Sequence, residues 1–94
     1  MDPRTSLLLT DLYQLAMLET YIEHRMCETA VFELFVRRLP RQRGFLVAAG
    51  LRHVLAFLES ARFTPQELAW LERDGGFKPA FLDYLASFRF TGDV

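Results

Sequence analysis

Residues 11–14 combine side chains that can bind a ligand. Asp11 is a favoured helix N-cap, and Gln14 three residues later can close an arrangement like a capping box. A helix that starts here offers unpaired N–H groups and a partial positive charge, which favour an anion. Tyr13 adds a ring that can stack on an aromatic ligand and a hydroxyl that can hydrogen-bond. These properties suit a small aromatic carboxylate; alternatively, Asp11 only caps and Tyr13 only packs.

A second candidate is the arginine pair Arg37 and Arg38, followed by Arg41 and Arg43 in a short basic loop. A strand that leads into such a loop can present planar guanidinium groups to phosphate oxygens. The alternative is a solvated loop in which an arginine pairs with Glu33. These residues therefore indicate a phosphate contact without requiring one.

Other familiar constellations are absent from the sequence. There is no G-x-G-x-x-G stretch and no Walker loop, and no serine lies in a nucleophile elbow. His24 and His53 stand alone, which is typical of surface or helix-end histidines, and Cys27 is expected to be a small buried residue. With no His, Cys and Asp at metal-ligand spacing, the segment is predicted to contain neither a catalytic residue nor a metal site.

The composition narrows the class of protein. Eleven basic and twelve acidic residues give a net charge of −1, which argues against non-specific nucleic-acid binding. A single cysteine rules out an internal disulfide, and a reducing, cytoplasmic compartment is expected. No apolar run approaches the roughly 18 residues of a membrane span. Because 51% of the residues are hydrophobic, including nine Phe, part of the apolar surface is expected to contact something outside the segment.

Helices and strands are both expected, so the predicted fold class is α+β, with helices packed on short strands. The helix signals are an apolar periodicity over residues 11–23 and again from Leu51. Thr64, Pro65 and Glu67 combine an N-cap, a proline at N1 and an acid at N3. That helix should stop at residues 75–76, and another should begin near Pro79 and carry apolar side chains inward.

The strand signals are three β-branched or aromatic stretches. Residues 29–38 have one wholly apolar face and one mixed face, residues 45–49 form a short run expected to be buried, and residues 88–94 begin an alternating pattern. Because a strand at a free end leaves an unpaired edge, the natural chain is expected to continue past Val94. Residues 1–94 are thus expected to form one small N-terminal domain, or part of one.

Five blocks of the sequence, in order, resemble nicotinate phosphoribosyltransferases. The first is LLTDLYQ at residues 8–14, and the second is TAVFELFVRRLP at residues 29–40. The others are GFLVAAGL at 44–51, FLDYL at 81–85 and FRFTGDV at 88–94. No block is decisive alone, but five in the right order make chance similarity improbable. The resemblance identifies the chain as the N-terminal segment of such an enzyme.

The resemblance implies an activity for the whole enzyme. The family joins nicotinate to phosphoribosyl pyrophosphate, forming nicotinate mononucleotide and pyrophosphate as the entry step into NAD synthesis. The reaction is coupled to ATP hydrolysis and requires Mg²⁺. The enzymes are cytosolic, usually homodimers with a shared active site, and place an α+β domain beside an irregular α/β barrel. No nucleic-acid or membrane partner is implied, and without the barrel the 94-residue segment is expected to be inactive alone.

The resemblance also implies residue roles. Tyr13 matches the tyrosine that reaches across the dimer and stacks on the pyridine ring, and Asp11 matches the acidic position of the same motif. Arg37 and Arg38 match paired arginines after the strand, for which a phosphate contact is expected. Neither histidine matches the family's phosphorylated histidine, which lies in the barrel. Two alternatives stay open: a relative acting on nicotinamide or quinolinate, and a non-enzymatic α+β interaction module.

Overall fold

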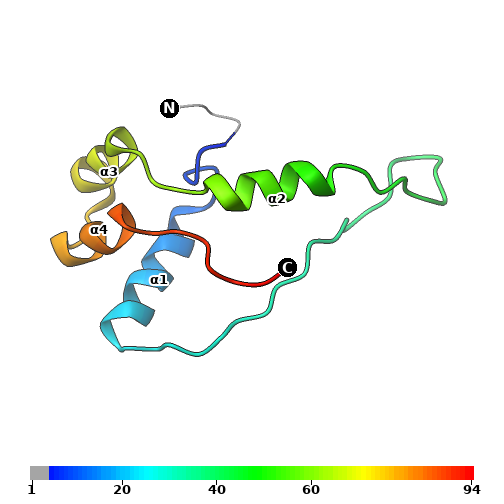
Figure 1. Cartoon of the computed structure of the whole chain (residues 1–94). Helices are drawn as coiled ribbons and strands as arrows, with labels where there is room; N and C mark the ends of the chain where they lie inside the picture. The colour runs from blue at the N-terminus through cyan, green and yellow to red at the C-terminus, as the bar shows by residue number, and fades with distance from the viewer. Residues whose placement is uncertain (1–4) are drawn as a thin grey trace.

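The computed structural model describes residues 5–94, and within this range all regular structure is helical (Figure 1). The elements are α1 (Leu12–Glu23), α2 (Leu51–Ser60), α3 (Pro65–Trp70), the π-helical turn η1 (Leu71–Gly75) and α4 (Pro79–Ala86). Helices α3, η1 and α4 form a compact unit, and α1 lies against it (Figure 1). Residues 25–50 leave the end of α1, run outside the helices and return to the start of α2.

Helix α1 starts and ends where the sequence predicts. Asp11 occupies the N-cap position with an extended backbone, and the helix ends at Glu23 with His24 as its C-cap. Leu15 is buried in the core, and Leu18 and Ile22, at helical spacing from it, pack against the same cluster. The apolar face predicted from the sequence is therefore the face of α1 that packs against the core.

The capping box at Thr64 is also confirmed. The Glu67 amide donates to the Thr64 hydroxyl at 3.2 Å, while the Thr64 amide donates to the Glu67 carboxylate at 2.9 Å. Pro65 occupies the first helical position, where its missing N–H costs nothing. The chain leaves the η1 turn at Gly76, whose φ of 69° is the left-handed conformation that glycine adopts without a steric penalty.

One cluster of buried side chains joins the N-terminal helix to the C-terminal unit. Its aromatic members interlock: the ring centroids of Phe77 and Phe81 are 5.4 Å apart, and Phe63 meets Phe88 edge-on at 6.0 Å. The buried members are Leu15, Phe63, Leu71, Phe77, Phe81 and Leu85. Apart from Leu15, all of them come from residues 63–85, so the core is largely local in sequence.

The predicted α+β class is wrong for this chain, because no strand occurs among residues 5–94. Residues 29–38, 45–49 and 88–94 carry strand-like patterns but form neither helix nor strand. Phe32 and Leu34 are 89% and 86% exposed, and the run at 45–49 is exposed rather than buried. A helix closes its hydrogen bonds within one segment, whereas a strand needs a neighbour, and these stretches have none in the described part of the chain.

Helix α2 forms as its periodicity predicts but buries none of its residues. It begins after Gly50, whose φ of 96° again requires a left-handed backbone. Val54, Phe57 and Leu58 are only half-buried, and Leu51 and Leu55 are exposed. This helix therefore carries an apolar face that the described residues cover only in part.

Glu67 is the buried charged residue at the centre of the fold, with 1% of its surface exposed. Besides the capping box, its carboxylate accepts a hydrogen bond from the Ser6 hydroxyl, which ties the N-terminal segment to α3. Burial raises the pKa of this carboxyl, but the hydrogen bonds from Ser6 and Thr64 outweigh burial and hold the pKa below its ordinary value of 4.5. The folded state therefore favours the ionised carboxylate.

This depressed pKa predicts a loss of stability in acid. The contribution of Glu67 is fully present above its unfolded pKa near 4.5 and is lost as pH falls through the lower folded value. A Glu67→Gln variant, which keeps the shape but not the charge, should lose about 1 kcal/mol at neutral pH. The difference from the wild type should shrink below pH 4.5.

Chemical unfolding across pH 3–7 measures this effect. The matched control is Glu59→Gln, because Glu59 is exposed in the last turn of α2 and makes no ion pair with a described residue. Its unfolding free energy should follow the wild type at every pH. If the unfolding free energies of Glu67→Gln and the wild type changed in parallel with pH, the ionised Glu67 carboxylate would not be what stabilises the fold.

Candidate functional site

The start of α1 presents its polar side chains to solvent. Tyr13 is 56% exposed, and its hydroxyl accepts a hydrogen bond from the Gln14 amide at 3.1 Å. Asp11 is exposed and sits at the N-cap, but its carboxylate makes no capping hydrogen bond. The predicted capping-box arrangement between Asp11 and Gln14 is therefore absent, because Gln14 bonds to Tyr13 instead. An exposed ring, an uncommitted carboxylate and a helix N-terminus lie within one turn.

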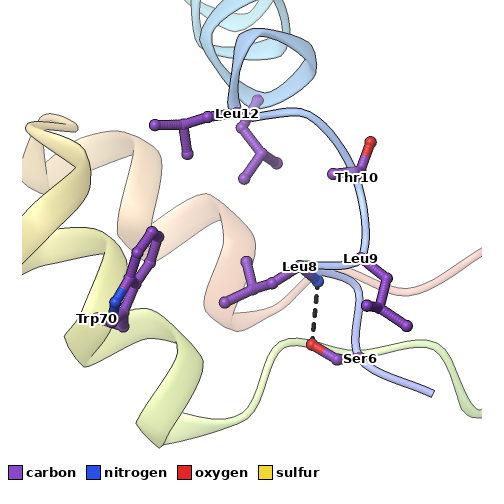
Figure 2. A pocket seen from close by; sticks show the side chains of 7 residues that line it. Ser6, Leu8, Leu9, Thr10, Leu12 and Trp70 are labelled. Carbon is purple, nitrogen blue, oxygen red and sulfur yellow. Dashed lines mark hydrogen bonds between the residues drawn. The ribbon is translucent and has the colours of Figure 1, made fainter. Parts of the chain in front are cut away.

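An apolar pocket opens beside this helix start (Figure 2). Its volume is about 550 Å³, within the range of small-molecule sites. It lies between the N-terminal segment, the first turn of α1 and Trp70 at the end of α3. The lining residues are Ser6, Leu8, Leu9, Thr10, Leu12, Leu15 and Trp70.

The lining offers little to an anionic ligand. None of the described residues that line it carries a cationic side chain. The Ser6 oxygen already accepts from the Leu8 amide at 3.1 Å while its hydroxyl donates to Glu67. Asp11 and Tyr13 do not line it. Sequence reasoning missed this pocket because Trp70 and the 6–15 segment meet only in the folded chain.

Arg37 and Arg38 lie on the segment that runs outside the helices (Figure 1). Both are exposed, and no hydrogen bond or ion pair joins them to Asp11, Tyr13 or Glu33 in the described range. Gln42, in the basic loop that follows, has a φ of 63°, a left-handed conformation uncommon for a residue with a side chain. The structure therefore does not bring the two predicted ligand-contact groups together.

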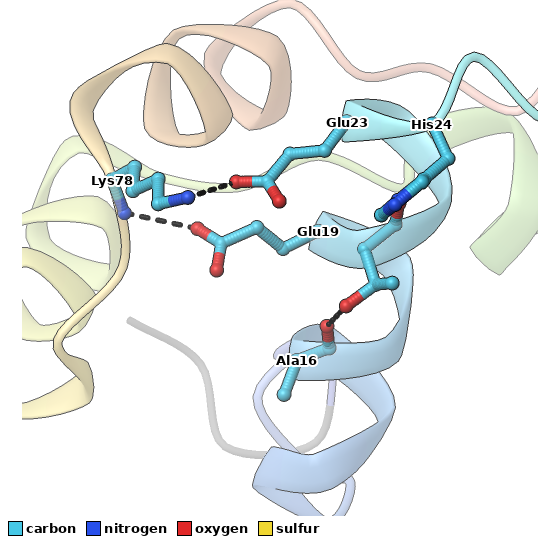
Figure 3. A network of polar contacts seen from close by, with 6 residues as sticks. Ala16, Glu19, Glu23, His24 and Lys78 are labelled. Atoms are coloured by element: carbon cyan, nitrogen blue, oxygen red, sulfur yellow. Dashed lines mark hydrogen bonds and ion pairs between the residues drawn. The ribbon is translucent and has the colours of Figure 1, made fainter.

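A polar network fixes α1 against the start of α4 (Figure 3). The Lys78 amide donates to the Glu19 carboxylate at 2.9 Å, and its ammonium group pairs with Glu23. The hydrogen bond with Glu23 and the charge of that carboxylate raise the pKa of Lys78. His24 contacts the Thr20 carbonyl through Nδ1 at 2.8 Å, as expected for a helix-end histidine. These contacts hold the C-terminal half of α1 against the start of α4.

The remaining features concern Cys27, metal ligands and membrane-spanning helices. Cys27 is exposed, so its predicted burial is wrong; it lies just after α1 on the segment outside the helices, where no core is within reach. Residues 5–94 contain no group of three or more His, Cys, Asp or Glu side chains that could hold a metal ion. None of the helices in that range is long and apolar enough to cross a membrane.

Comparison with known proteins gives one consistent result. The model of the nicotinate phosphoribosyltransferase N-terminal domain family matches residues 8–94. The relative named nicotinate phosphoribosyltransferase pncB2 of Mycobacterium tuberculosis is 51% identical over 87 residues, which cover 93% of this chain and 19% of the relative. No solved structure gives a significant match.

More distant relatives carry the same name. The nicotinate phosphoribosyltransferase of Bacillus subtilis is 43% identical over 74 residues, which cover 78% of this chain and 15% of that protein. The mouse nicotinate phosphoribosyltransferase is 36% identical over 88 residues, covering 90% of this chain and 16% of that protein. The chain thus spans about a fifth or less of the length of these curated relatives. With nearly all of it inside the family match, the chain belongs to the nicotinate phosphoribosyltransferase N-terminal domain family.

Proposed function

We propose that this chain serves as the N-terminal domain of an enzyme that joins nicotinate to phosphoribosyl pyrophosphate. The observation that carries the proposal is the family match over residues 8–94, together with relatives of the same name in bacteria and mouse. In NAD salvage the enzyme would release nicotinate mononucleotide and pyrophosphate. The reacting groups would be supplied by the polypeptide that the relatives carry beyond this domain, since no catalytic constellation is present in the sequence.

Tyr13 is the proposed contact to the pyridine ring. Its exposed face supports this role, because a ring buried within its own protomer could not reach a ligand. Asp11, beside it at the helix N-cap, is proposed to order the local backbone or to accept a hydrogen bond on the ligand side. The proposed site is completed by a second protomer in a homodimer.

Arg37 and Arg38 are proposed to contact a phosphate group of phosphoribosyl pyrophosphate. Their exposure and their lack of ion pairs within residues 5–94 leave both guanidinium groups available for bidentate contacts. The described residues contain no group of His, Cys, Asp or Glu side chains that could hold Mg²⁺. The Mg²⁺ and ATP that the family resemblance implies are therefore proposed to bind the remainder of a cytoplasmic enzyme.

Turnover by the complete enzyme tests this function. Nicotinate, nicotinamide and quinolinate should each be offered with phosphoribosyl pyrophosphate, Mg²⁺ and ATP, and the mononucleotide product measured. Nicotinate is expected to give the highest kcat/KM. A higher kcat/KM for either other pyridine would replace nicotinate as the substrate and leave the family assignment intact.

A further inference from the structure

The first turn of α1 carries Tyr13 but has no side-chain cap. Tyr13 is the second residue of the helix, and the Asp11 carboxylate at the N-cap makes no capping hydrogen bond. The first amides of a helix have no partner within the helix, so an uncapped first turn is prone to fray. The position of the Tyr13 ring therefore depends on how the segment before the helix is held.

That segment begins at a hydrogen-bonded anchor. The Ser6 hydroxyl donates to the Glu67 carboxylate, and the same oxygen accepts from the Leu8 amide at 3.1 Å. The Ser6 carbonyl accepts from the Leu9 amide at 3.2 Å, which closes a turn. Glu67 is buried in α3 and also accepts from the Thr64 amide at 2.9 Å, so its carboxylate has a fixed position. A hydrogen bond to a carboxylate is stronger than one between neutral groups. Ser6 thus joins the turn to a rigid point of the core.

The stretch between this anchor and α1 is only loosely packed. Leu9 and Thr10 line the apolar pocket, and Leu9 is 69% exposed (Figure 2). Leu8 packs against the core cluster, but apolar contacts are non-directional, whereas hydrogen bonds have a preferred geometry. After the first turn of α1, Leu15 is buried in the core. Tyr13 therefore lies between two attachments, and the hydrogen bonds of the first one fix the direction in which the chain approaches α1.

We propose that Ser6, held by Glu67, is a positioning residue for nicotinate binding, because it fixes the start of α1 and thereby the place of the Tyr13 ring. The inference rests on the proposed contact between Tyr13 and the pyridine ring. Stacked rings need their centroids within about 4.5–7 Å in an offset arrangement, so a displaced helix start weakens the stack. Ser6 acts only through Tyr13, and its loss should therefore change KM for nicotinate more than kcat.

Steady-state kinetics of the complete enzyme tests this role. Ser6→Ala should raise KM for nicotinate roughly five-fold and leave kcat and the KM for phosphoribosyl pyrophosphate within about two-fold of the wild type. Ser6→Thr keeps the hydroxyl, and its KM for nicotinate should return to within about two-fold of the wild type.

The matched control is Thr64→Ala, which removes a hydroxyl on the other side of the same capping box. The Thr64 hydroxyl accepts from the Glu67 amide, so its loss weakens the start of α3 but leaves the hydrogen bond between Ser6 and Glu67 in place. Thr64→Ala should lower the melting temperature of the complete enzyme without raising KM for nicotinate.

A double-mutant cycle shows whether Ser6 acts through Tyr13. In the Tyr13→Ala background, Ser6→Ala should change KM for nicotinate by less than about two-fold, because the ring that it positions is gone. Hydrogen exchange of the complete enzyme reports the anchor itself. In Ser6→Ala the Leu8 amide should lose protection, while the amides of residues 18–22, later in α1, should keep theirs.

Three results would overturn the proposal. The first is an unchanged KM for nicotinate in Ser6→Ala, whatever the exchange of the Leu8 amide. The second is an equal rise in Thr64→Ala, which would reflect a general loss of stability. The third is a full effect of Ser6→Ala in the Tyr13→Ala background. A normal KM in Tyr13→Ala alone would instead remove the proposed ring contact, so failure of the proposed site and failure of the positioning role are distinguishable.

Discussion

Leu71→Ala is expected to destabilise the chain by about 3 kcal/mol, because it removes a buried side chain from a core that cannot collapse around it. Leu71 is 0% exposed and lies where α3 passes into the η1 turn. The buried cluster to which it belongs also contains residues of α1 and α4, so a cavity at Leu71 weakens the packing among α1, η1 and α4. For a chain of this size, 3 kcal/mol is a large part of the net stability, and the melting temperature should fall by at least 10 °C.

The matched control is Leu51→Ala, the same chemical change at a helix position that is 66% exposed. Alanine is as good a helix former as leucine, and no cavity is created, so the expected change is within about 0.5 kcal/mol. Thermal unfolding followed by far-ultraviolet circular dichroism compares both variants with the wild type. Equal melting temperatures for Leu71→Ala and Leu51→Ala would show that the core around Leu71 does not hold the fold.

The helices could be predicted because their signals are local. Thr64 and Glu67 satisfy each other across three residues, and Gly76 ends the turn through its own backbone conformation. Such features depend on little beyond their own segment, so sequence alone suffices to place them. The core positions Phe81 and Leu85 follow from the same periodicity once the helix is placed.

The absence of strands could not be foreseen, because whether a strand-like segment forms a strand depends on a partner that a single sequence does not specify. Residues 29–38 have the composition and alternation of a strand, yet Phe32 stays exposed since no other described segment offers a ladder. The same limit applies to the pocket, where Trp70 meets residues more than fifty positions earlier in the chain. At the site, the exposure of Tyr13 could be anticipated from the motif, whereas the hydrogen bond that draws Gln14 away from Asp11 could not.

In the complete enzyme, Tyr13→Ala is expected to raise KM for nicotinate roughly ten-fold, the effect of losing a stacked aromatic contact. The fold should be unaffected, because Tyr13 is 56% exposed and does not belong to the buried cluster. If the stack forms in both the ground state and the transition state, kcat should change little while KM rises. Steady-state kinetics with nicotinate as the varied substrate measures both constants.

Two further substitutions separate the ring from its hydroxyl and from the helix that carries it. Tyr13→Phe keeps the stacking face and removes only the acceptor for Gln14, so its KM should stay within about two-fold of the wild type. Tyr21→Ala removes a ring of similar exposure, 44%, two turns further along α1, and should leave KM unchanged. A high KM in all three variants would mean that α1 itself is disturbed. A normal KM for Tyr13→Ala would remove Tyr13 from the nicotinate site. Only an increase confined to Tyr13→Ala requires that its ring meets the ligand.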